Sequence, residues 1–432
     1  EGDSALAMLK SGMSKEQGKY MGLFPLKGKV INVRDISSKK LLENDEINNL
    51  KKILGLETGK VYKDLKSLRY GKVAVASDQD HDGFHIRSLV FNVFSVLWPS
   101  LFKFPNFLSS FLTPIIKITN KKNKNNIKSF YTITEYERWE KKNNPSHWTI
   151  KYYKGLGTST KNEAKEYFEN IDKHTITYDY NNNSNKAFDL AFNKKKADDR
   201  KKWLMNYDRE DILEPVENRV QLDDMINKEL IHFSNSDVLR SIPSIVDGLK
   251  ESQRKVLFGV LKRNLTSEVK VSQLSGYISE HTAYHHGEKS LEDTIVSLAR
   301  DFIGTNNINI LMPNGQYGTR LTAKDNAQSR YIFTLLNSIT KLIYNPQDNP
   351  LLEYLNDEGQ DIEPLWYIPV IPMVLVNGVR GIGTGFSTNI PSYNPLEIIQ
   401  NLKHLLKKEK LQSLQPWYDK FKGKITKISS TS

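Results

Sequence analysis

Three aspartates stand on alternate positions in the run Asp78-Gln79-Asp80-His81-Asp82-Gly83. Carboxylates crowded in this way repel one another unless a divalent cation shares them. The run matches the start of a calcium loop, but such a loop needs a bidentate Glu at its twelfth position, where this chain has Leu89. A hard cation held by few carboxylates, with sites left for phosphate oxygens, is typical of Mg²⁺. The spacing therefore favours a magnesium site, and the alternative is a solvated acidic turn.

The segments on either side of the acidic run predict the elements that position it. Residues 72–77 form a short, apolar, β-branched segment that is typical of a buried strand. Residues 84–97 have the apolar spacing of a helix. In open α/β sheets, ligands bind at turns of this kind, where a strand ends and a helix begins. We therefore expect the three carboxylates at a ligand-binding edge of a sheet.

Composition narrows the class of partner. The 432 residues include 62 Lys and Arg against 50 Asp and Glu, a net charge of +12, which favours a polyanion such as nucleic acid. The chain has no cysteine, so a metal site must be built from carboxylates, histidines and water. The most apolar region, residues 88–118, is interrupted by Pro, Asn and Lys, so we expect no membrane span.

Periodicity predicts the organisation of the rest of the chain. Residues 1–170 alternate strand-like and helical segments, and the Asn-rich tracts 120–126 and 181–185 are expected to be mobile surface insertions. The basic segment 194–202 is typical of a solvated helix face, with phosphate contact as the alternative. Later segments predict a helix at 253–263 flanked by Arg254, Lys255, Lys262 and Arg263, a helix at 326–343 with Ile332, Leu335, Leu336 and Ile339 inward, and a strand at 367–376.

Nine short motifs follow one another along the chain. In the first half they are Glu1-Gly2-Asp3-Ser4-Ala5, Pro25-Leu26-Lys27-Gly28-Lys29, the acidic run, and Tyr153-Lys154-Gly155-Leu156-Gly157-Thr158. In the second half they are Asp247-Gly248-Leu249-Lys250, Tyr284-His285-His286-Gly287-Glu288, Gly315-Gln316-Tyr317-Gly318-Thr319-Arg320, Arg330-Tyr331 and Gly381-Ile382-Gly383-Thr384-Gly385. These motifs, in this order, resemble those of eukaryotic type IIA DNA topoisomerases, and the resemblance extends over nearly the whole chain.

The resemblance implies a multidomain fold of α/β and α+β parts. We expect a Rossmann-like TOPRIM domain with its C-terminal extension at residues 1–172 and a basic linker or arm at 173–235. A winged-helix DNA-binding domain that carries the catalytic tyrosine is expected at 236–345, and the start of a β-rich tower domain at 346–432. The segment 320–330 is one residue shorter than in close relatives, so the geometry of the loop before Tyr331 is left open.

The same likeness assigns roles to the acids. Glu1, Asp78 and Asp80 would hold one or two Mg²⁺ ions, with Asp82 nearby as an outer or alternate ligand. Such ions neutralise the scissile phosphate and stabilise the leaving 3′ oxygen in an in-line displacement.

The likeness also names a nucleophile. A single tyrosine among 20 is ordinarily a packing residue, but the Arg330-Tyr331 pair resembles the cleavage site of the family. A phenol titrates near 10, so attack at neutral pH requires a cation or a base, and Arg330 can stabilise the transition state. His285 and His286 would lie against the cleaved strand as phosphate donors or a proton relay, and the alternative is a structural histidine pair.

Several residues match family positions that contact DNA. They are Lys29, Asn32, Lys154, Arg200, Lys201, Lys250, Tyr284 and His285. Contacts of this kind fix register and carry no sequence information, and the alternative for each residue is a solvated side chain. Ile382, between Gly381 and Gly383, resembles a wedge that enters a base step and bends DNA, whereas without the likeness it would be a strand residue in a tight bend.

The expected function is therefore DNA cleavage and religation by the core of an ATP-dependent type II topoisomerase, an isomerase. We expect double-stranded DNA as substrate, a nuclear homodimer whose active sites are shared between protomers, and ATP binding only in a domain outside this chain. The alternatives are another TOPRIM enzyme, such as a type IA topoisomerase or a nuclease, and a non-catalytic DNA-bending module.

Overall fold

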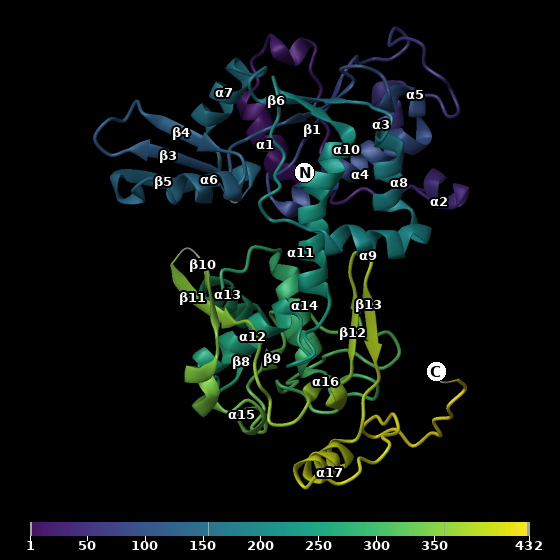
Figure 1. The fold of residues 1–432 in the computed structure, drawn as a ribbon, viewed down its shortest axis with the longest axis vertical. Helices are drawn as coiled ribbons and strands as arrows, with labels where there is room; N and C mark the ends of the chain where they lie inside the picture. The colour runs from purple at the N-terminus through teal and green to yellow at the C-terminus, as the bar shows by residue number, and fades with distance from the viewer. Residues whose placement is uncertain (1, 154, 358, 430–432) are drawn as a thin grey trace. The chain divides into compact units, whose positions relative to one another are not determined.

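The computed structural model describes residues 2–153, 155–357 and 359–429. The chain divides into two compact units, residues 1–236 and residues 237–432 (Figure 1).

A four-stranded mixed sheet forms the centre of the first unit. Its strands are β1 (Val73–Ala76), β2 (Leu108–Phe111), β6 (Thr175–Asp179) and β7 (Arg219–Gln221), and they lie in the order β1-β2-β6-β7. β1 and β2 are parallel, β2 and β6 are antiparallel, and β6 and β7 are parallel. Helix α4 (His81–Leu97) connects β1 to β2. The strand predicted at 72–77 and the helix predicted at 84–97 are thus confirmed, and the acidic run spans the turn after β1 and the first residues of α4.

Helices and an aromatic-rich core surround this sheet. The helices are α1 (Gly2–Gly12), α2 (Ser38–Leu42), α3 (Asp45–Leu54), α5 (Pro99–Phe102), α7 (Lys161–Glu169), α8 (Ser184–Phe192), α9 (Ala197–Met205) and α10 (Leu222–Met225), followed by a π-helical turn at Ile226–Leu230 and α11 (Ile231–Ser241). Phe91, Phe94 and Trp98 of the α4 segment are almost fully buried in the core. Burial of large aromatic side chains is a major source of stability, so α4 is held firmly.

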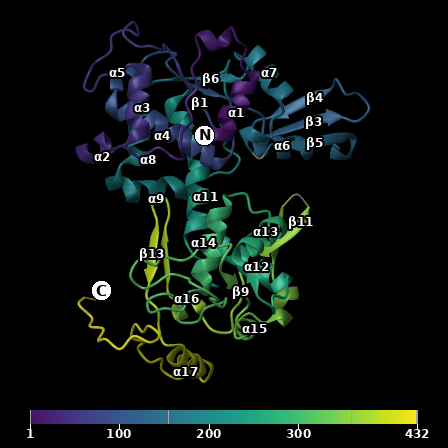
Figure 2. The same ribbon diagram turned by 180° about the vertical axis from the view of Figure 1, so that it is seen from behind.

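A second, three-stranded antiparallel sheet extends to one side of the first unit in both views (Figures 1 and 2). It consists of β3 (Ile116–Asn120), β4 (Ile127–Phe130) and β5 (Trp148–Tyr152), and α6 (Ile133–Glu140) packs on it. The Asn-rich tract 120–126 forms the exposed β3–β4 turn.

The second Asn-rich tract, 181–185, is not a separate insertion. Asn181 Oδ1 accepts hydrogen bonds from Asn183 N at 2.9 Å and Ser184 N at 3.0 Å, at the start of α8. Asn side chains favour such turns because they mimic a backbone carbonyl. The tract is therefore part of the fold.

The second unit begins with three helices that pack on one another, α12 (Glu251–Lys262), α13 (Val271–His281) and α14 (Glu288–Ala299). The α-helices α15 (Thr340–Ile343), α16 (Met373–Val376) and α17 (Pro395–Leu406) follow, and antiparallel strand pairs complete the unit. The antiparallel pairs are β8 (Val269–Lys270) with β9 (Phe333–Thr334), β10 (Tyr354–Asp357) with β11 (Gln360–Pro364), and β12 (Val379–Ile382) with β13 (Ser387–Ile390). The helix predicted at 253–263 is confirmed as α12.

The helix predicted at 326–343 is wrong. Residues 332, 334 and 336 are buried in alternation, which is the period of an extended chain, and Ile339, expected inside, is 36% exposed. The backbone pairs with distant segments, since Phe333 N donates to Asn314 O at 2.9 Å and Met312 N donates to Leu335 O at 2.8 Å. Only Thr340–Ile343 is helical.

The strand predicted at 367–376 is also wrong. Pro369 and Pro372 have no backbone N–H to donate to a ladder, and the segment ends in the short helix α16. Tyr367 N donates instead to the buried Asp247 Oδ2 at 3.0 Å. The segment is thus anchored by a side chain and not by a sheet.

Candidate active site

Asp78 lies in the turn after β1 and is held by a backbone amide. Its Oδ1 accepts a hydrogen bond from Leu156 N at 2.7 Å, and a Cβ on Gly155 would lie 2.7 Å from its Oδ2. Gly155 therefore permits this close approach. Burial raises the pKa of Asp78, the Leu156 bond opposes that shift, and the charge of Asp80 adds to it. A cation at this point would favour the ionised forms of both carboxylates.

Asp80 begins α4. Its Oδ1 accepts a hydrogen bond from Gly83 N at 2.8 Å, which is the geometry of an N-cap. A Cβ on Gly83 would lie 1.8 Å from the carbonyl oxygen of Asp78, so only glycine fits at that position. The acidic run is thus folded tightly, and Asp80 remains exposed at its surface.

Asp82 is engaged by a lysine. Lys29 Nζ lies 2.6 Å from Asp82 Oδ1 and 3.2 Å from His85 Nδ1, and 4.6 Å from the centre of the Phe233 ring. Lys29, predicted to touch DNA, is therefore also the partner of one predicted metal-site acid.

The three aspartates thus have three different partners: the Leu156 amide, the Gly83 amide and the Lys29 ammonium group. Among the described residues, no group of three or more His, Asp or Glu side chains is arranged to hold a metal. Glu1 and Lys154, predicted as a ligand and as a DNA contact, lie outside the described residues. Asp78 and Asp80 nevertheless offer two nearby oxygen donors of like charge, which is the donor type that Mg²⁺ prefers.

The remaining predicted DNA contacts of the first unit have partners within the protein. Asn32 Nδ2 donates to Phe192 O at 2.8 Å, and Arg200 Nη1 donates to Leu190 O at 2.9 Å and Asn193 O at 2.6 Å, at the end of α8. Lys201 forms an exposed pair with Asp198 at 2.8 Å. Arg200 thus has a structural role at a helix end, whereas Lys201 is solvated.

In the second unit, Tyr331 is an exposed tyrosine on an anchored backbone. Its side chain is 65% exposed, while the next residue, Ile332, is 1% exposed in the core. The Arg330 guanidinium lies over the Tyr331 ring, 4.9 Å from its centre. The phenol is therefore accessible and has a permanent cation beside it.

The turn that follows α13 carries the two predicted histidines. His285 Nε2 lies 2.9 Å from Asp357 Oδ2 on β10. The His286 ring contacts the Tyr284 ring edge-on, and Tyr284, predicted to touch DNA, is only 9% exposed. Lys255 Nζ fixes the turn by donating to Thr282 O at 2.8 Å.

Two of the four basic residues predicted around the apolar face of α12, Arg254 and Lys255, are buried. Arg254 Nε pairs with Asp247 Oδ2 at 2.7 Å, and Lys255 Nζ pairs with Glu363 Oε1 at 2.7 Å. Burial of these charges is tolerated because each is paired. Lys250, at the start of α12, is only partly buried.

Ile382 stands at the end of β12 in the β12–β13 hairpin (Figure 1). It is 69% exposed, and it faces Ser387 across the hairpin. A Cβ on the preceding Gly381 would lie 2.6 Å from Ser241 O and 2.7 Å from Pro243 Cδ. The glycine lets the hairpin backbone pack closely while the isoleucine points into solvent.

Three family models together match almost the whole chain. The Toprim domain matches residues 1–108, the C-terminal associated domain of TOPRIM matches 111–238, and the DNA gyrase/topoisomerase IV model matches 240–432. DNA topoisomerase 2 of Saccharomyces cerevisiae is 49% identical over 431 residues, which is 99% of this chain. The chain belongs to the DNA topoisomerase II family.

Other members of the topoisomerase II family show the same extent of similarity. DNA topoisomerase 2 of Bombyx mori is 53% identical over 98% of this chain, and that of Plasmodium falciparum is 50% identical over 100%. This chain covers 30%, 28% and 31% of the yeast, silkworm and Plasmodium proteins, respectively.

A solved structure agrees with the fold. The Plasmodium falciparum topoisomerase II DNA-binding, cleavage and re-ligation domain superposes with a TM-score of 0.80 at 49% identity, and the match covers 100% of this chain and 59% of that one. The predicted fold class, a TOPRIM α/β part followed by further α and β parts, is thereby confirmed. A Toprim domain also implies metal-dependent catalysis in general.

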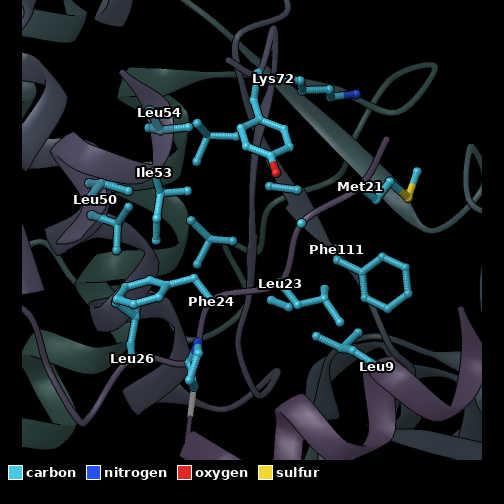
Figure 3. Close-up of a pocket in the computed structure, with 18 of the residues that line it drawn as sticks. Leu9, Met21, Leu23, Phe24, Leu26, Leu50, Ile53, Leu54, Lys72 and Phe111 are labelled. Atoms are coloured by element: carbon cyan, nitrogen blue, oxygen red, sulfur yellow. The ribbon is translucent and has the colours of Figure 1, made fainter. Parts of the chain in front are cut away.

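The first unit contains a cavity of about 750 Å³. Figure 3 shows that Leu9, Leu23, Phe24 and Ile53 are among the side chains around it. Its lining also includes β1 but none of Asp78, Asp80 and Asp82. The cavity is therefore not the cation site.

Sequence reasoning missed the partners of several site residues. The Leu156 amide and Asp357 were not predicted, nor was the bond between Glu292 and Ser329. Gly155 was a usable signal for the contact between the Leu156 amide and Asp78, because a glycine often marks close backbone approach. No local pattern signals Asp357, which is 72 residues from His285.

Proposed function

We propose that this chain is the DNA-cleavage and religation core of an ATP-dependent type II DNA topoisomerase. The observation that carries the proposal is the exposed Tyr331 phenol beneath the Arg330 guanidinium, on a backbone fixed by the buried Ile332. The substrate is double-stranded DNA, in keeping with the DNA-binding, cleavage and re-ligation domain to which the chain is similar.

In the proposed reaction, the Tyr331 oxygen attacks a backbone phosphorus and the bond to the 3′ oxygen breaks. The phenol proton passes to a base or to water and the leaving 3′ oxygen takes up a proton from water, so that the products are a 5′-phosphotyrosyl link and a free 3′ hydroxyl. Arg330 stabilises the charge on the phosphate oxygens, and His285 and His286 donate hydrogen bonds to the same strand. Because the phosphodiester is conserved in the link, the reverse attack reseals the strand without a separate energy source.

Glu1, Asp78 and Asp80 would hold one or two Mg²⁺ ions, which neutralise the phosphate and stabilise the leaving oxygen. Lys29 would keep Asp82 beside this group through the 2.6 Å contact. Burial raises the pKa of the Asp78 carboxyl group and so destabilises its ionised form, and a bound cation would stabilise that form again.

The proposal extends to the assembly. Two protomers would each cut one strand with a tyrosine delivered to the partner's carboxylates, and a second duplex would pass through the gap. ATP would act through a part of the protein outside this chain, and the protein would work in the nucleus, as expected for eukaryotic relatives. Among the described residues, none of the helices has the length and apolar character of a membrane span.

A denaturant-quenched cleavage assay tests the proposal. Incubation with Mg²⁺ and duplex DNA should yield protein linked to 5′ DNA ends, and Tyr331→Phe should abolish that product. Tyr20→Phe is the matched control, because Tyr20 is also 61% exposed and its variant should cleave normally. Cleavage that persists in Tyr331→Phe would refute the assignment and favour another TOPRIM chemistry, while no cleavage by the unmodified protein would favour a DNA-bending module.

A further inference from the structure

We infer that Glu292 and Ser329 form a positioning pair for Tyr331. This inference rests on the proposed role of Tyr331 as nucleophile. Ser329 Oγ donates a short hydrogen bond to Glu292 Oε1, which lies 37 residues earlier in the chain. Glu292 belongs to α14 and is 9% exposed, next to the fully buried Leu291. A buried carboxylate on a core helix thus holds a side chain two residues before Tyr331.

The backbone on both sides of Tyr331 is tied to the same group of helices. Ser329 O accepts from Ser272 N at 3.3 Å, and Ile332 O accepts from Val271 N at 3.1 Å, both at the start of α13. α13 packs against α14, so the Glu292 bond and the two α13 bonds hold one segment from two neighbouring helices. The bond from Ser329 Oγ adds a side-chain contact two residues before the phenol.

The same helix holds the loop at a second point. Arg300, which follows α14, donates from Nε to Tyr317 O at 3.2 Å and from Nη2 to Asn326 Oδ1 at 3.4 Å. Arg300, the C-cap of α14, lies eight positions after Glu292, a rise of roughly 12 Å. α14 and its C-cap residue therefore bind the segment that leads to Tyr331 at two places: Arg300 contacts Tyr317 and Asn326, and Glu292 contacts Ser329.

Between these two points the loop is folded on itself. Asp325 accepts hydrogen bonds from Thr319 N at 2.9 Å, Thr319 Oγ1 at 2.6 Å and Thr322 Oγ1 at 2.7 Å, and these bonds hold the pKa of Asp325 far below its usual range. The loop whose length left its geometry open is thus ordered around one carboxylate. This ordered loop leads into the segment that carries Ser329 and Tyr331.

The position of the phenol oxygen matters because attack on phosphorus requires alignment with the leaving oxygen. A displacement of about 1 Å can lower such a rate by roughly a hundredfold. Glu292 is buried and Ser329 is bound to it, so the pair is not a DNA contact. Its loss should therefore change the cleavage step at saturating DNA and leave DNA affinity unchanged.

The test compares Ser329→Ala and Glu292→Gln with the unmodified protein. Single-turnover formation of the covalent complex is followed at saturating duplex DNA with Mg²⁺, and the Kd for DNA and the unfolding temperature are measured separately. Ser329→Ala should slow cleavage about tenfold, because a hydrogen bond to a charged group is lost, with unchanged Kd. Glu292→Gln keeps an acceptor for Ser329 Oγ and should slow cleavage less than Ser329→Ala does.

Ser275→Ala is the matched control. Ser275 lies on α13, is 1% exposed, and its hydroxyl has no hydrogen-bond partner in the described part of the chain. This variant should cleave at the unmodified rate. An unchanged cleavage rate in Ser329→Ala, or a rate loss that follows DNA affinity and unfolding temperature, would overturn the inference.

Tyr331→Phe, run in parallel, separates this inference from the proposed function. Covalent product in Tyr331→Phe would refute the proposed function. An inert Tyr331→Phe together with a fully active Ser329→Ala would refute the positioning pair alone.

Discussion

Single side chains in the acidic run have structural as well as electrostatic tasks. Asp80 caps α4, Asp82 is paired with Lys29, and Asp78 is bound by the Leu156 amide. Gly83 allows the turn to close, since a Cβ there would lie 1.8 Å from Asp78 O. The acidic side chains therefore both stabilise the turn and supply negative charge, and a useful substitution changes only one of these two properties.

Asp80→Asn makes that separation. An Asn side chain can still accept the hydrogen bond from Gly83 N, and Asn caps a helix about as well as Asp. We expect an unchanged unfolding temperature, while the Mg²⁺ concentration for half-maximal cleavage rises roughly tenfold or more.

A magnesium titration of DNA cleavage measures this shift. Asp45→Asn is the control, because Asp45 is an exposed acid in the first turn of α3. A titration curve for Asp80→Asn that superposes on that of the unmodified protein would count against a ligand role.

His232 is a buried histidine that should make the free energy of unfolding depend on pH. It is 7% exposed, its Nδ1 lies 3.0 Å from Tyr207 Oη, and burial lowers its pKa below the usual 6.5. The unfolded chain therefore binds this proton at a higher pH than the folded chain does, so acid favours unfolding. We expect the free energy of unfolding to fall over the pH range from about 6.5, the pKa of histidine in the unfolded chain, down to the lower pKa of His232 in the folded chain.

Urea unfolding at pH values of about 7.5, 6.5 and 5.5, which bracket the ordinary pKa of histidine, checks this expectation. His232→Gln keeps polar groups at the site but cannot titrate, so its unfolding free energy should fall less with acid. Some slope should remain, because burial also lowers the pKa of His174. An equal slope in the variant and the unmodified protein would exclude His232 as a source.

At the scale of elements, the β12–β13 hairpin has the clearest prediction. Ile382 is 69% exposed, so Ile382→Ala should change the free energy of unfolding by less than about 0.5 kcal/mol. If Ile382 is a wedge, the variant should bend bound DNA less.

Energy transfer between dyes at the two ends of a short duplex measures the bend. Ile428→Ala is a suitable control, since Ile428 is 88% exposed and outside the hairpin. Full bending by Ile382→Ala would show that Ile382 is not a wedge.

The local pattern of apolar residues was enough to predict several helices and strands correctly. The strand before the acidic run, α4 and α12 were predicted from periodicity. The false helix at 326–343 arose because Ile332, Leu335 and Leu336 fit a helical period, although their backbone pairs with distant segments. Non-local pairing of this kind is invisible in a single window of sequence.

The candidate site was predictable in part for the same reason. Residue types and spacing singled out Asp78 and Asp80, whereas Tyr331 was named only by the family likeness, which also gave the acids their roles. The sequence did not reveal that Lys29 meets Asp82, 53 residues away, or that Arg200 binds the end of α8. Long-range partners follow from the fold alone.

At the scale of the whole molecule, the two halves of the proposed chemistry lie in different units. The described carboxylates belong to residues 1–236 and Tyr331 belongs to residues 237–432. Each half is ordered by contacts within its own unit: the Leu156 amide for Asp78, and α13 and α14 for the tyrosine segment. Such independent preorganisation suits a reaction in which the nucleophile and the metal come from different protomers.

The most direct test is to locate the covalent link. DNA cleaved by the protein with Mg²⁺ is trapped with denaturant, the DNA is trimmed with nuclease, and the protein is digested for peptide mass spectrometry. We predict a nucleotide joined through its 5′ phosphate to Tyr331. A nucleotide on any other residue, or cleaved DNA without any attached peptide, would contradict the proposed role of Tyr331.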